Sequence, residues 1–89
     1  MYISKETICV QAVFAVLEDT FECTCEFLFV DLPLVEMLSI TPIDMVRFTL
    51  ALEVSLGFQL DLEGITNRSS VNDVASAVLR SEHQALSAA

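Results

Sequence analysis

The sequence predicts an all-α fold: a single small four-helix bundle with three long helices, one short helix and a long first loop. Its 89 residues are enough for one compact domain and too few for two. Apolar residues make up 54% of the chain, which is enough to drive collapse and argues against a disordered protein. Apolar positions recur at helical spacing in several segments, and helix-start signals precede two of them.

The first helix is expected over residues 5–18, with Ser4 as its N-cap. Asp19 and Thr20 interrupt the periodicity and should end it. The long stretch that follows, residues 20–40, has weak periodicity, and its phenylalanines favour packing across the core. The apolar positions of the first helix are Cys9, Val13, Val16 and Leu17, flanked by Ile8 and Ala12.

The second long helix, over residues 42–56, has the clearest start signal in the chain. Thr41 offers an N-cap hydroxyl, and Pro42 occupies the first helical position, where its missing N–H costs nothing. Asp44 completes a capping box with Thr41. Gly57 should end the helix as the residue after its last turn.

Two further helices are expected, a short one over residues 61–66 and a last one over residues 70–82. Ser70 and Asp73 repeat the capping-box spacing at the start of the last helix. Residues 83–89 should fray. One face of the last helix is apolar and consists of Val71, Val74, Ala75, Val78 and Leu79.

The chain is strongly acidic, with 13 carboxylates against 4 basic side chains and a formal net charge of −9. Such a charge repels phosphate backbones and anionic lipid surfaces, and it attracts a protein partner with a basic face. We therefore expect no nucleic-acid binding. No apolar run is long enough for a membrane span and no secretory signal pattern is present, so we expect a cytoplasmic protein.

Cysteine and histidine usage favours neither a metal site nor an active site. Three cysteines, an odd number, indicate a reducing compartment. Cys23 and Cys25 lack a second cysteine pair, and the only histidine, His83, lies in the polar tail. Zinc needs three or four converging ligands, and nucleophilic catalysis needs an adjacent base. We expect no metal, no catalytic residue and no enzymatic activity.

Four segments resemble motifs of the acyl carrier protein family. Residues 34–38 (LVEML) are similar to the F-V-E-D-L segment that ends the family's long loop, and residues 38–46 (LSITPIDMV) to the L-G-x-D-S-L-D-x-V signature of its second helix. Residues 51–58 (ALEVSLGF) resemble A-L-E-E-E-F-G-I, and residues 69–74 (SSVNDV) resemble T-T-V-x-D-V. The resemblance extends from about residue 9 to residue 82 and implies an acyl-carrier-like bundle.

The chain departs from the family at the residue that defines its chemistry. In acyl carrier proteins the signature serine carries the 4′-phosphopantetheine arm, and Pro42 stands at that position here. Proline has no nucleophilic oxygen, so the resemblance implies a carrier homologue without the arm and without another cofactor. The alternative is that the phosphopantetheine arm is attached to a neighbouring hydroxyl. Ser39 is the candidate for this, because Thr41 is expected to be engaged in capping.

The second helix also departs from the family. Acids on this helix dock basic enzyme surfaces in the family, whereas Arg47 and Val54 replace two of them here. The helix is apolar almost all round, and a helical wheel assigns Val46, Leu52 and Leu56 to the core. The remaining apolar positions cannot all join the core, so some of them should form an exposed interface, unless the Phe-rich loop covers them. The expected partner-binding residues are Ile43, Met45, Arg47, Leu50 and Val54.

The predicted function is an acyl-carrier-like subunit without the arm that acts by protein–protein contact in fatty-acid, polyketide or related biosynthesis. Its partner is expected to be a biosynthetic enzyme or a genuine acyl carrier protein, and a homodimer or heterodimer is also open. One alternative is a working carrier that is pantetheinylated at Ser39. Another is a small helical domain that binds a lipid non-covalently.

Overall fold

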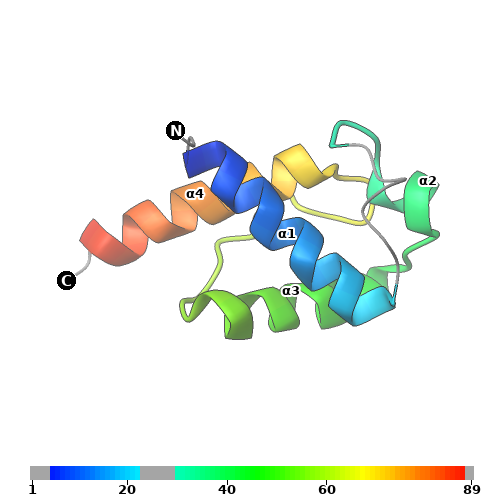
Figure 1. Ribbon diagram of the computed structural model, residues 1–89, viewed down its shortest axis with the longest axis horizontal. Helices are drawn as coiled ribbons and strands as arrows, with labels where there is room; N and C mark the ends of the chain where they lie inside the picture. Colours follow the sequence, from blue (N-terminus) through cyan, green and yellow to red (C-terminus); the bar gives the residue numbers. More distant parts are fainter. Residues whose placement is uncertain (1–4, 23–29, 88–89) are drawn as a thin grey trace.

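Four helices make up most of the chain that the computed structural model describes, residues 5–22 and 30–87 (Figure 1). Within these ranges the structure has no strand beyond an isolated bridge between Pro33 and Ser70. The all-α prediction is therefore confirmed. The helices are α1 (Lys5–Phe21), α2 (Leu34–Leu38), α3 (Pro42–Leu56) and α4 (Val71–Ser87).

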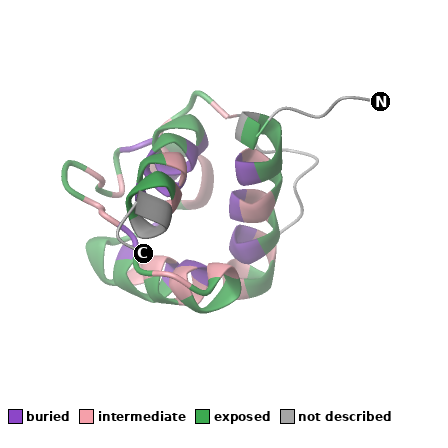
Figure 2. Cartoon of the chain, turned by 90° about the vertical axis from the view of Figure 1, so that its left-hand side faces the viewer, coloured by how far each residue is buried: buried purple, intermediate pink, exposed green. Residues whose placement is uncertain are grey.

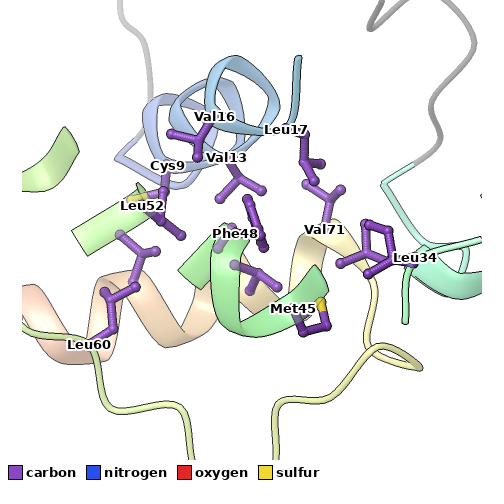
Figure 3. Packing of buried hydrophobic residues seen from close by; sticks show 14 residues of the cluster. Cys9, Val13, Val16, Leu17, Leu34, Met45, Phe48, Leu52, Leu60 and Val71 are labelled. Atoms are coloured by element: carbon purple, nitrogen blue, oxygen red, sulfur yellow. The ribbon is translucent and has the colours of Figure 1, made fainter. Parts of the chain in front are cut away.

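The core lies where α1 packs against both α4 and α3, and the buried faces of the helices point to the middle of the molecule (Figure 2). Phe48 of α3 is fully buried at its centre, close to Val13 of α1 (Figure 3). Its ring centroid lies 6.4 Å from that of Phe21. Apart from Phe48, the largest fully buried side chains are Leu17, Leu34, Ile40, Leu52, Val13, Val71, Val74 and Val78.

The helices at the two ends of the chain are longer than predicted. α1 continues to Phe21 instead of ending at residue 18, because Phe21 packs against the core and its ring lies against Phe48. α4 continues to Ser87, so residues 83–87 of the expected frayed tail are helical. An ion pair between Lys5 and Glu82 joins the two helices.

The prediction of a short helix over residues 61–66 is wrong. This segment forms turns, with Gly64 at φ +83°, a left-handed conformation that ends any helical run. The Leu60 N–H donates to Glu53 Oε2 at 2.9 Å and the Asp61 N–H to Ser81 Oγ at 2.7 Å. Side chains of α3 and α4 thus fix the segment, and six residues are too few to form a helix unaided.

The short helix of the bundle is α2, within the long loop. Its first residue, Leu34, is fully buried, so the loop packs on the core at this point. Two backbone bonds tie α2 to the segment before α4: Leu34 N–H to the Ser69 carbonyl at 2.9 Å and Val35 N–H to the Asn67 carbonyl at 2.8 Å. Residues 23–29 lie outside the described residues, so the packing predicted for their phenylalanines is not tested.

Ser39 ends α2 in the left-handed region, with φ 54° and ψ 36°, and its N–H donates to the Val35 carbonyl. Replacing it with glycine removes the steric cost of this conformation for an L-residue. We expect Ser39→Gly to raise the free energy of unfolding by about 0.5–1 kcal/mol, measured by urea denaturation. The reciprocal control is Gly57→Ala: Gly57 has φ +82°, so this change should lower stability although nothing lies within 4 Å of the added Cβ. An unchanged urea midpoint for Ser39→Gly would contradict the expectation.

Candidate functional site

The start of α3 is built as the sequence predicts. The Asp44 N–H donates to Thr41 Oγ1 at 3.1 Å, and the Thr41 N–H donates to Asp44 Oδ2 at 3.0 Å, so both bonds of the capping box are present. Pro42 occupies the first helical position, and Gly57 ends the helix in the left-handed conformation. The predicted boundaries of this helix, residues 42–56, are confirmed.

The hydroxyl groups near Pro42 lie in two different settings. The Thr41 hydroxyl is engaged in the cap of α3. Ser39 is exposed and lies in the tight turn that joins α2 to α3. Pro42 itself is exposed and presents only ring carbons, so position 42 has no group that could accept a phosphoester.

The capping box also sets the ionisation of Asp44. Hydrogen bonds from the Thr41 backbone and side chain hold the pKa of this carboxyl below its usual value of 3.8, and the positive charge of Arg47 acts in the same direction. The carboxylate therefore stabilises the folded state wherever it is ionised.

An Asp44→Asn variant should reveal this contribution through its pH dependence. Because the folded-state pKa is the lower one, the stabilisation is fully present above the unfolded value of 3.8 and is lost as pH falls through the folded value. We expect the wild-type protein to be more stable than Asp44→Asn at neutral pH, with the difference vanishing on acidification. Urea midpoints from about pH 7 to 2 measure it. Glu36→Gln, an exposed acid outside the cap, controls for net charge; an equal pH response in both variants would contradict the assignment.

α3 buries one apolar face and exposes another. The buried face consists of Met45, Phe48 and Leu52, which are 6%, 0% and 0% exposed. Val46, predicted to be in the core, is 58% exposed, and Met45, predicted to bind a partner, is buried. Both arrangements suit a helix that is apolar almost all round. The observed one buries the large ring of Phe48 and leaves the smaller Val46 outside.

The other predicted partner-binding residues are exposed: Arg47 together with three of the residues of an outer apolar face. We define this outer apolar face of α3 as the four aliphatic residues at positions i, i+3, i+7 and i+11, a row about 16 Å long. No described residue covers it, and the loop residues 23–29 that were the alternative cover lie outside the described ranges. Its members are Ile43 (74% exposed), Val46 (58%), Leu50 (57%) and Val54 (84%).

Two hollows adjoin the outer apolar face. The N-terminal groove, about 420 Å³, lies between the first half of α3 and the segment that follows Asp61, and Val46 belongs to its lining. The C-terminal groove is a shallow, widely open depression that includes Leu50 and Val54. The full linings are Pro42, Met45, Val46, Thr49, Leu62, Ile65, Thr66 and Asn67 for the first, and Leu50, Glu53, Val54, Gly57, Phe58 and Gln59 for the second.

The rest of the described chain was searched for metal ligands, nucleophiles and membrane-spanning helices. No three histidine, cysteine or acidic residues in residues 5–22 and 30–87 lie close enough to hold a metal ion. Burial raises the pKa of the Cys9 thiol, which makes it a poor nucleophile; Cys23 and Cys25 are outside the described residues. His83 is exposed on α4. None of the described helices has the length and apolar character needed to cross a bilayer.

Comparisons with protein-family models, curated proteins and solved structures gave no match for this chain.

Proposed function

We propose that the protein is an acyl-carrier-like subunit without the phosphopantetheine arm, which acts by protein–protein contact in fatty-acid, polyketide or related carrier-dependent biosynthesis. The observation that carries the proposal is Pro42 within an intact capping box. The residues around it keep the helix start that the resemblance implies, while the hydroxyl that the carrier chemistry needs is replaced. In this role the protein uses no cofactor and catalyses no reaction.

The outer apolar face of α3 supports the contact role. Four aliphatic side chains lie more than half exposed along one side of a single helix. Apolar surface gathered in this way on a small domain marks an interaction site, because leaving it in water is unfavourable. The net charge of −9 favours a partner with a basic surface, such as a biosynthetic enzyme. A genuine acyl carrier protein, the other expected partner, would have to bind through the outer apolar face.

The first test is the intact mass of the protein from its native host, and again after treatment with a phosphopantetheinyl transferase and coenzyme A. We expect the unmodified mass in both samples. A genuine acyl carrier protein in the same reaction is the positive control. A pantetheine-sized increase would overturn the proposal, and peptide mapping to Ser39 would then restore an ordinary carrier role.

The second test concerns the contact itself. Val54→Glu places a charge in the outer apolar face, whereas Ile8→Glu places one at a 52% exposed apolar residue of α1. Affinity purification from the host should lose the co-purifying biosynthetic partner with Val54→Glu and keep it with Ile8→Glu. If the partner is retained by both variants, the outer apolar face is excluded as the contact.

A second candidate function is non-covalent lipid binding, which the N-terminal groove favours. Its volume of about 420 Å³ lies within the range of small-molecule sites, and Met45, Val46, Leu62 and Ile65 give it an apolar lining. Organic extraction of the purified protein followed by mass spectrometry tests it. If no fatty acid or isoprenoid is released, this candidate is lost.

A further inference from the structure

We propose that the outer apolar face of α3, together with its two grooves, receives a single amphipathic helix with basic flanks from a partner protein. The inference rests on the proposed function, because it names the kind of partner element that binds the face already assigned to contact. It adds the shape and the charge of the partner element that binds there. The loss of the phosphopantetheine arm determines neither of them.

The spacing of the two grooves fits a helix. Val46 in the N-terminal groove and Val54 in the C-terminal groove are eight residues apart on α3, which is about 12 Å along the helix axis. On a partner helix, residues at i and i+7 or i+8 are about 10–12 Å apart. One helix laid along α3 can therefore place an apolar side chain in the N-terminal groove beside Val46, pack a second against the shallow surface at Val54, and rest the residues between them on Leu50.

An extended strand suits this face less well. Strand recognition depends on main-chain hydrogen bonds to an exposed sheet edge, and the described residues form no sheet. Along the middle of α3 the backbone N–H and C=O groups pair within the helix, so its outer face offers side chains alone. Side-chain packing into grooves is the mode by which amphipathic helices are recognised.

Charge selects the class of helix. Glu53 lines the C-terminal groove, Asp44 lies in the first turn of α3, and the chain carries a net charge of −9. The Glu53 and Asp44 carboxylates each accept a backbone N–H of the chain, and the exposed Arg47 lies one turn from Ile43 and Leu50. It is therefore the net charge of −9 that lysine or arginine beside the apolar stripe of the partner helix complements. A second copy of the chain brings another −9 to the same place, and an anionic lipid surface is repelled as well.

The extent of the face points to a docked helix rather than a large permanent interface. A standard protein–protein interface buries about 800 Å² on each partner. Four aliphatic side chains and two shallow grooves on one helix supply only part of such an area. A helix about three turns long matches the extent of the face, because its row of residues is about 16 Å long.

The test uses the full chain and a fluorescein-labelled synthetic peptide of leucine and lysine, with leucines at i, i+3 or i+4, and i+7. A peptide of the same composition with the leucines scrambled around the helix is the matched control. Binding is measured by fluorescence anisotropy at physiological salt, and amide NMR shifts locate it. We expect the amphipathic peptide to bind at least about tenfold more tightly than the scrambled one and to perturb α3.

Two variants separate apolar docking from simple charge attraction. Leu50→Glu and Val54→Glu each add a negative charge, which strengthens non-specific binding of a basic peptide but destroys the apolar contact. We expect each to weaken binding by about tenfold or more. Ile8→Glu adds the same charge on α1 and should not weaken it. Equal affinity for the scrambled peptide, or tighter binding by Leu50→Glu and Val54→Glu, would overturn the proposal.

The remaining outcomes distinguish this inference from the proposed function. A dimer in sedimentation equilibrium that Val54→Glu dissociates would make a second copy the occupant and overturn the helical partner. Loss of the native partner with Val54→Glu, without binding of any helical peptide, would overturn the helix while leaving the contact function intact. A pantetheine-sized mass increase would overturn the armless function, whatever the peptide does.

Discussion

Replacing Phe48 with alanine is expected to lower the free energy of unfolding by about 3–5 kcal/mol, a large part of the roughly 5–15 kcal/mol available to a natural domain. Phe48 is fully buried, and its ring lies against Phe21. Its removal takes apolar area out of the core and leaves a cavity that α1 and α3 can only partly close. Urea denaturation followed by helical circular dichroism measures the loss as a lower urea midpoint.

Leu50→Ala is the matched control, because Leu50 lies on the same helix and is 57% exposed. Shortening this side chain should change the free energy of unfolding by no more than about 0.5 kcal/mol. If the two substitutions cost the same, the assignment of a buried and an outer face to α3 is wrong. A small cost at Phe48 alone would mean that the core is centred elsewhere.

The ends of α3 could be predicted from the sequence because the interactions that fix them are local. Thr41, Pro42 and Asp44 lie within four consecutive positions, and both capping-box bonds join residues three apart. Gly57 ends the helix through its own backbone conformation. Ser70 and Asp73 start α4 in the same way, with both reciprocal bonds present. Interactions between residues this close in the chain can be predicted from a short stretch of sequence.

The faces of α3 could not be assigned in this way. Met45 and Val46 are neighbours of similar hydrophobicity, and a helical wheel that is apolar on both sides allows either one to face the core. The positions of α1 and α4 decide between them, and these depend on the whole fold. The surface prediction was therefore right in kind, an exposed apolar patch on this helix, and wrong about Met45 and Val46.

The helix predicted in the segment after α3, residues 61–66, was wrong for a related reason. Its path depends on long-range bonds, such as that between the Asp61 N–H and Ser81 Oγ, which join residues twenty positions apart. That path forms one wall of the N-terminal groove through Leu62 and Ile65. A groove made by two distant segments has no signal in either one, so the sequence could predict an exposed face but not the hollows beside it.

Glutamate at two neighbouring positions should separate folding from binding. Met45→Glu places a carboxylate among buried side chains, which removes about 1.5–3 kcal/mol of apolar burial and adds the cost of desolvating a charge. We expect the free energy of unfolding to fall by about 3 kcal/mol or more. Val46→Glu adds the same group on the 58% exposed side of the helix and should change stability by no more than about 0.5 kcal/mol.

The binding measurement shows whether Val46 contributes to docking in a protein that remains folded. Val46 lines the N-terminal groove and belongs to the outer apolar face, so Val46→Glu should bind the amphipathic peptide about tenfold more weakly than the wild-type protein while remaining folded. Met45→Glu acts mainly on folding, because Met45 is 6% exposed; Met45 also belongs to the lining of the N-terminal groove, so the fraction that stays folded should bind more weakly as well. Because the two substitutions add the same charge one residue apart, a difference between them cannot arise from net charge. An equal loss of stability at both positions would mean that α3 does not divide its apolar residues between a core and an outer face.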